Sequence, residues 1–347
     1  MRRTLFLIAS VLVSALFLYL ALRGIPLNEI ATSLQQANPA WIVVALVMGS
    51  LGLWTRGIRW RGLLQNRINP VEAFYMLCVA MLLNQLPMRA GEVARSALVT
   101  RSGVPFFTAA TSIVVERLLD TLFVVIVLSL SLTQIPDAPP TITQAATLFG
   151  IAGIVALGSL LVFARRPQLA RDLLAFVERL LPFIKKLPLH SLMEHILDGI
   201  KPLAHWRTAA HAIFWTIISW TFSLLTFYPT ALALGVTDGA VIMTLLSVTM
   251  ASFAIAIPVS VASIGPFEGA VIVSGQAVGI ARALAGALGF LFHGITVLTY
   301  AIWGTVGLLA LGVSLSDVLK SDKSNDKPDI EPIMAGESLS VNSGQIK

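Results

Sequence analysis

Apolar runs of about twenty residues recur along this chain and leave it few possible folds. They predict full membrane spans at 4–22, 41–59, 113–133, 143–163, 209–232 and 284–313, with two shorter segments at 73–87 and 239–257. An α-helix needs about 20 apolar residues to cross a bilayer, whereas barrel strands are alternating segments of roughly ten residues. The sequence therefore predicts an all-α integral membrane protein, a polytopic helical bundle.

The composition supports this class and argues against several functions. Only 12% of the residues are charged, against about 25% in soluble domains. The net charge of +6 comes from basic residues in loops beside spans, as the positive-inside rule expects, so no nucleic-acid partner is predicted. No metal-ligand spacing, phosphate-binding glycine loop or nucleophile motif is found. We expect no cofactor, no metal and no enzymatic activity.

Loop charges predict the orientation. Segment 164–208 holds eight Lys and Arg residues and should be cytoplasmic, as should both termini. The first apolar run is longer than the apolar core of a signal peptide and has no convincing cleavage site, so we interpret it as an uncleaved span. The predicted location is the cytoplasmic membrane, with multiple passes.

Counting crossings then constrains the two shorter segments. Residues 73–112 must begin and end inside, and residues 239–282 must begin and end outside. The interpretation is two re-entrant hairpins that enter from opposite faces. Placing Glu92 on Glu268 also puts Gly103 on Gly279 and Arg117 on His293. Together these indicate an inverted repeat, a design in which transporters bind substrate between the repeats.

The domain prediction follows from this repeat. Residues 1–315 form one membrane domain, with a first half at about 1–163, an amphipathic interfacial segment at 164–208 and a second half at 209–315. The apolar positions of 168–206 follow helical spacing and are interrupted by prolines, which is typical of short helices at a membrane surface. Residues 316–347 are polar and are predicted to be a disordered cytoplasmic tail.

Charged residues inside the apolar chain are the candidate site, because charge at membrane depth usually serves a function. One stretch, 84–95, contains Asn84, Arg89, Glu92 and Arg95 around a Pro-Met-Arg-Ala-Gly break; a new helix N-terminus there could attract an anion.

A second cluster contains Glu116, Arg117 and Asp120. Glu116 and Asp120 are four residues apart and share a helix face, so they need a cation: Arg89, Arg95, Arg117 or a proton. A structural network and a substrate or proton site both remain open.

Two further places carry polar residues. Arg56 and Arg59 lie at the end of the second span, either as interfacial anchors or as contacts to a phosphate. Glu268 and His293 are the polar candidates of the second half, where Gly265-Pro266 mirrors the first helix break.

These residues resemble one family. The patterns N-x-L-P-x-R-A-G-E-x-x-R, E-R-x-x-D and P-x-S-x-x-x-x-G-x-x-E, at residues 84–95, 116–120 and 258–268, are similar to the membrane region of lysylphosphatidylglycerol synthases, a flippase-like family. The resemblance covers about residues 1–315. It departs at Pro266-Phe267 before Glu268, and at His293 where Arg is commoner, which bears on the charge of the cargo.

The resemblance implies a multi-pass protein that handles lipids. Bifunctional members flip an aminoacylated phospholipid made by a soluble C-terminal domain; the chain ends in a short polar tail, so we do not expect aminoacyl transfer. Stand-alone relatives belong to glycolipid, cardiolipin or hopanoid pathways, which leaves the cargo open.

Three hypotheses follow. The first is a protein that binds and flips a lipid or lipid-linked head group, passively or driven by protons or membrane potential. Arg89, Arg95 and Arg117 would hold an anionic head group. The alternatives are a membrane enzyme that uses Glu116 and Asp120 as acid and base, and a scaffold that recruits enzymes through 164–208. The expected partners are membrane lipids, either anionic phospholipid or a lipid-linked cargo, with a homo-oligomer or lipid-biosynthesis enzymes as further partners.

Overall fold

The computed structural model describes residues 2–86, 90–135, 140–180, 189–256 and 261–313. Within these ranges all regular structure is helical, which confirms the all-α polytopic class. The helices of the first part of the chain are α1 (Arg2–Leu22), α2 (Leu27–Gln35), α3 (Pro39–Leu63), α4 (Pro70–Leu83), α5 (Gly91–Thr100), α6 (Phe106–Leu132) and α7 (Pro140–Arg165). They are followed by α8 (Pro167–Leu180), α9 (Leu189–Ile200), η2 (Lys201–Ala204), α10 (Trp206–Ala233), α11 (Ala240–Ala256), η3 (Val261–Ser263), α12 (Pro266–Ala277) and α13 (Arg282–Ala310).

The long helices match the predicted spans. In the described part of the chain, four helices are long and apolar enough to cross a membrane, namely α3, α7, α10 and α13. Helices α1 and α2 add a fifth span if the pair is counted as one, although it is bent by 87°. Gly24 lies at this bend with a φ of +78°, in the left-handed region that glycine adopts without a steric penalty. Helix α6 has 27 residues, but its charged residues set it apart from a simple apolar span.

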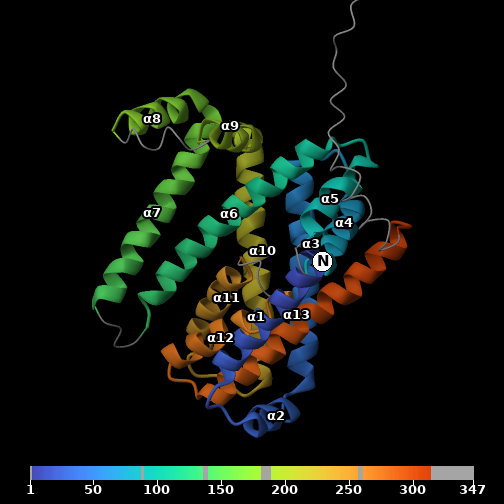
Figure 1. Ribbon diagram of the computed structural model, residues 1–347, viewed down its shortest axis with the longest axis vertical. Coiled ribbons are helices and arrows are strands. Elements are labelled where there is room, and N and C mark those ends of the chain that lie inside the picture. Colours follow the sequence, from blue (N-terminus) through green and yellow to red (C-terminus); the bar gives the residue numbers. More distant parts are fainter. Residues whose placement is uncertain (1, 87–89, 136–139, 181–188, 257–260, 314–347) are drawn as a thin grey trace, which may run out of the picture.

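The two halves of the chain are packed into each other. Helix α3 runs beside α10, and α13 lies against α4 while α6 lies against α11 (Figure 1). Glycines allow these close approaches: a Cβ at Gly304 of α13 would lie 2.5 Å from the Cβ of Leu82 in α4. Helices of the first half therefore pack directly against helices of the second half, and both halves contribute to the space between them.

Each predicted hairpin is a pair of contacting helices. Helix α4 packs on α5, and α11 packs on α12. In Figure 1 the α4–α5 pair lies toward the end of the molecule that carries α8 and α9, whereas α12 lies toward the end that carries α2. Re-entry into the membrane and the inversion of the repeat stay predictions.

The segment 164–208 contains two short amphipathic helices. Helix α8 leaves Leu169, Leu173, Phe176 and Leu180 exposed along one side, and α9 lies beside α6 and α7 (Figure 1). An ion pair at 2.8 Å joins Arg171 of α8 to Glu194 of α9, and the hydrogen bond from this Arg lowers the pKa of Glu194. Contact with a membrane surface stays a prediction, and the predicted tail, 316–347, lies outside the described residues.

Candidate functional site

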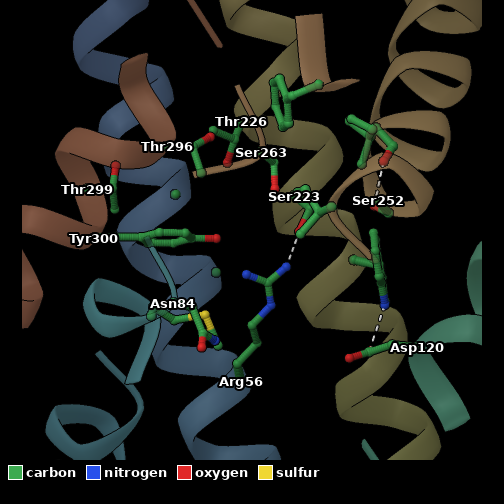
Figure 2. A pocket seen from close by; sticks show the side chains of 18 of the residues that line it. Arg56, Asn84, Asp120, Ser223, Thr226, Ser252, Ser263, Thr296, Thr299 and Tyr300 are labelled. Atoms are coloured by element: carbon green, nitrogen blue, oxygen red, sulfur yellow. Dashed lines mark hydrogen bonds between the residues drawn. The ribbon is translucent and has the colours of Figure 1, made fainter. Parts of the chain in front are cut away.

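A cavity of about 290 Å³ lies between the two halves. Its wall is built from α3, α4, α5, α6, α10, α11, α12 and α13 together with residues of η3. Figure 2 shows Arg56, Ser223, Thr226, Ser263 and Tyr300 gathered around one space. The cavity therefore combines charged and hydroxyl side chains with apolar ones such as Leu77 and Val124.

A chain of ion pairs forms one side of the cavity. Arg59 of α3 holds Asp120 of α6 through two hydrogen bonds, Nη1 to Oδ1 at 2.5 Å and Nη2 to Oδ2 at 3.1 Å. Glu116, one turn earlier on α6, accepts from Arg59 at 3.3 Å and from Arg95 of α5 at 2.5 Å. The indole N–H of Trp220 also donates to Asp120 at 2.9 Å. Glu116 therefore bridges two cations and ties α3, α5 and α6 together.

Glu116 and Asp120 share a helix face, as the sequence predicted. The cation that bonds to both of them, Arg59, was not among the predicted partners. The sequence offered Arg89, Arg95, Arg117 or a proton; Arg89 lies outside the described residues, and of the other two Arg residues Arg95 pairs with Glu116 whereas Arg117 pairs with Glu92. Arg59 was missed as their main partner because only the packing of α3 against α6 brings it there. Arg59 is buried with 2% exposure, so it does not act as an interfacial anchor.

Aromatic contacts fix the position of Arg95. Its guanidinium lies 4.6 Å from the ring centre of Trp60, a distance at which the π face attracts a cation. The indole N–H of Trp60 donates to Ser112 at 3.0 Å. The guanidinium of Arg95 thus contacts both Glu116 and the ring of Trp60, and the hydrogen bond to Ser112 holds that ring in place.

Arg56 differs from the other guanidinium groups of the cavity. It lies one turn before Arg59 on α3 and donates to Ser223 of α10 at 2.8 Å (Figure 2). Among the described residues, no carboxylate lies within ion-pairing distance of Arg56. Arg56 is therefore a cation that lines the cavity and has a neutral partner.

Two matched pairs occur where the repeat alignment places them. Arg117 of α6 donates to Glu92 of α5, and His293 of α13 lies 2.6 Å from Glu268 of α12 through Nδ1. Both pairs are separated by 25 residues in sequence, and both join the short helix of a hairpin to the long helix that follows. The inversion of the repeat stays a prediction, but the positions that the alignment matches, Glu92 with Glu268 and Arg117 with His293, form corresponding pairs.

Glu268 also caps its helix. Its Oε2 accepts from the backbone N–H of Gly265 at 2.7 Å, which satisfies a donor at the start of α12. Gly265 has a φ of +96°, and the ring of Phe267 stacks on His293 at 4.5 Å. One buried carboxylate therefore fixes both the helix break and the imidazole at the edge of the cavity.

Substitution of Glu268 by alanine is expected to destabilise the second hairpin. The change leaves the Gly265 N–H and His293 without their acceptor, at a cost of about 2–3 kcal/mol. The measurement is the thermal unfolding midpoint of purified protein in detergent. Glu29→Ala is the control, since Glu29 occupies the same third position of α2 but is exposed; equal midpoints for the two variants would contradict the role of Glu268.

Most predicted site residues meet at this cavity. The lining includes Arg56, Arg59, Asn84, Arg95, Glu116, Arg117, Asp120 and His293. Glu92 and Glu268 lie behind the wall, bonded to Arg117 and His293. The predicted residue Arg89 lies outside the described residues. Their roles in substrate binding stay predictions.

The hydroxyl groups of the second half were missed in the sequence. They line the cavity from α10, α11, η3 and α13, and are Ser223, Thr226, Ser252, Ser263, Thr296, Thr299 and Tyr300. A signal for some of them exists, because Ser223 and Thr226, like Thr296 and Thr299, are three residues apart and share a helix face. Within the described ranges, no three His, Cys or carboxylate side chains converge as metal ligands.

Comparison with known proteins adds two findings. The family model for the lysylphosphatidylglycerol synthase TM region matches residues 7–304. Glycosyltransferase AglD of Haloferax volcanii is 26% identical, over an alignment that covers 90% of this chain and 56% of that protein. The chain thus spans a little over half the length of this relative. No solved structure matches the chain.

Proposed function

This chain belongs to the family of lysylphosphatidylglycerol synthase TM regions, and from that premise we propose that it binds a lipid head group in its central cavity and moves the lipid between leaflets. The coarse conclusion is a multi-pass membrane protein of lipid or glycolipid biosynthesis or transport. The finer proposal rests on one observation: a cavity lined by Arg and hydroxyl side chains lies between two interlocked halves.

The cavity is suited to a head group for physical reasons. Charged or polar groups cannot cross a hydrocarbon core without a large desolvation cost, so a path for a head group needs polar partners at membrane depth. Arg59 is paired with Glu116 and Asp120, and Arg95 with Glu116, which leaves Arg56 as the cation without a carboxylate for an incoming anion. Apolar residues such as Leu77, Val124 and Phe253 also line the cavity and suit the adjoining glycerol and acyl carbons.

The proposed orientation follows the loop charges. The end of the molecule that carries α8 and α9 faces the cytoplasm, together with both termini, in the cytoplasmic membrane. The two hairpins would then border the cavity from opposite sides, and each could open it to one leaflet.

Lipid exchange in proteoliposomes tests the proposal. We expect the protein to accelerate loss of fluorescent phosphatidylglycerol from the inner leaflet, as measured by quenching with external dithionite. Arg56→Gln should slow this exchange by about tenfold or more, because it removes a charge-assisted contact of roughly 1.5–3 kcal/mol.

The control is Arg207→Gln, which removes an exposed Arg whose guanidinium lies over Trp206 at 5.7 Å, away from the cavity. It should leave the exchange rate unchanged. Folded wild-type protein that never accelerates exchange of any lipid tried would count against translocation. An equal loss of rate in both variants would show that the cavity is not the path.

A membrane enzyme is the second candidate, and the name of the glycosyltransferase relative favours it. Its acid and base would be Glu116 and Asp120. Both carboxylates are held by Arg59, which opposes the proton exchange that such a role needs. Mass spectrometry of the lipids after the exchange assay separates the two, since an enzyme alters lipid mass whereas a translocase alters only sidedness.

A further inference from the structure

The charged groups of the cavity leave one positive charge without a carboxylate. The cavity is lined by two carboxylates, Glu116 and Asp120, and by four Arg residues, Arg56, Arg59, Arg95 and Arg117. Glu92 behind the wall pairs with Arg117, so three carboxylates serve four guanidinium groups. Every one of these carboxylates already contacts an Arg, whereas Arg56 contacts a serine. The cavity therefore offers a cation to a ligand and keeps its anions engaged.

The hydroxyl groups of the cavity face it as hydrogen-bond acceptors. Five of the seven donate their own proton to a backbone carbonyl of their helix, namely Ser223 (3.1 Å), Thr226 (2.8 Å), Ser252 (2.6 Å), Thr296 (2.8 Å) and Thr299 (2.7 Å). A hydroxyl has one proton and two lone pairs. The remaining lone pairs can accept only from a ligand that brings its own donors.

The free donors of the cavity come from α3, from α13 and from the end of α4. Asn84 accepts from the Gly91 N–H through Oδ1 at 3.1 Å, so its amide NH₂ is the free end of that side chain. Among the described residues, the Tyr300 hydroxyl has no bonded partner either. Figure 2 shows Asn84, Arg56 and Tyr300 on one side of the space, with Thr226 and Ser263 beyond them. This wall suits a group that only accepts, such as a phosphate.

We propose that the cavity selects a lipid whose head group joins a phosphodiester to an uncharged, hydroxyl-bearing part, a polyol or sugar, and disfavours a head group that carries ammonium. This inference rests on the proposed function, since it names the class of head group that the cavity binds. The phosphate oxygens accept from Arg56, Asn84 and Tyr300. The hydroxyls of the polyol or sugar donate to Thr226, Ser252 and Thr296.

An ammonium head group fits this arrangement poorly. It finds acceptors but no free carboxylate, and it places a like charge in the same low-dielectric chamber as Arg56. Lysylphosphatidylglycerol carries two ammonium groups beside its phosphate. The inference therefore predicts that this chain disfavours lysylphosphatidylglycerol, the lipid for which its family is named.

Binding of short-chain lipids to the detergent-purified protein tests the selectivity without requiring transport. The probes are dihexanoyl-phosphatidylglycerol, its lysyl ester and dihexanoyl-phosphatidylmethanol, which keeps the phosphodiester but lacks the glycerol hydroxyls. We expect the phosphatidylglycerol to bind about tenfold more tightly than the lysyl ester and several-fold more tightly than the phosphatidylmethanol.

Two variants assign the preference to the two walls. Arg56→Gln should weaken binding of the phosphatidylglycerol by about tenfold. It should weaken the lysyl ester much less, because the lost phosphate contact is offset there by the lost repulsion between Arg56 and the ammonium groups. Thr226→Val with Thr296→Val keeps the side-chain shape and should abolish the advantage of phosphatidylglycerol over phosphatidylmethanol. Arg207→Gln should change none of these affinities.

The outcomes distinguish this inference from the proposed function. Equal or tighter binding of the lysyl ester overturns the inference and leaves lipid binding intact. Absence of binding for all three lipids overturns both. Binding in the expected order without any leaflet exchange supports the head-group class and overturns translocation alone.

Discussion

Glu116→Gln is expected to destabilise the protein by about 3–5 kcal/mol, the usual cost of breaking a buried ion pair. The carboxylate of Glu116 is the link between Arg59 and Arg95, and the side chains of all three are at most 4% exposed. Without it, Arg95 loses its carboxylate and Arg59 keeps only Asp120, with both guanidinium groups buried beside a neutral amide. Since domains are stable by only about 5–15 kcal/mol, the midpoint of thermal unfolding in detergent should fall sharply.

The double substitution Arg95→Met with Glu116→Leu separates loss of an ion pair from loss of a contact. Replacement of both partners by apolar groups is often nearly neutral, so the double variant should recover much of the stability that Glu116→Gln loses. Glu194→Gln is the matched control, because its ion pair with Arg171 is exposed and contributes about 0–1 kcal/mol. Similar midpoints for Glu116→Gln and Glu194→Gln would contradict the bridging role.

The sequence predicted the helices because their cause is local. A run of twenty apolar residues determines a span wherever it packs, and helices α3, α7, α10 and α13 follow the predicted ranges closely. The helix breaks at Gly91 and Pro266 were equally visible, since proline and glycine act on the backbone where they stand. Even the pairing of Glu92 with Arg117 fitted the repeat alignment.

The partners of the buried charges could not be predicted, because they depend on which helices touch. Arg59 is 57 residues from Glu116 and 157 from Thr216, to which it also donates. Sequence reasoning favoured Arg89, Arg95 and Arg117 as the head-group cations; Arg89 lies outside the described residues, and the packing engages the other two with carboxylates. For Arg56 the sequence favoured an interfacial anchor over a phosphate contact; the structure places it beside Ser223 of α10 and so makes it the available cation.

The glycine at the first helix break is the second position where a large effect is expected. Gly91 is the first residue of α5, and its N–H donates to Asn84 at the end of α4. A Cβ added there would overlap the backbone carbonyl oxygen of Ala80 and lie 2.6 Å from Oδ1 of Asn84. The overlap is with backbone, which no change of rotamer can relieve, so α4 and α5 must move apart.

Gly91→Ala should therefore destabilise the protein by about 1–3 kcal/mol or more, the cost of overpacking a close contact. It should also reduce lipid binding, because separation of α4 from α5 displaces Asn84 and Arg95 from the cavity wall. Gly158→Ala is the control: it lies in α7, where an added Cβ meets nothing within 4 Å, and it should be neutral or stabilising by up to roughly 1 kcal/mol. Thermal unfolding and lipid affinity are measured on both variants. If Gly91→Ala matched Gly158→Ala in both, the close approach of α4 and α5 would have no part in shaping the cavity.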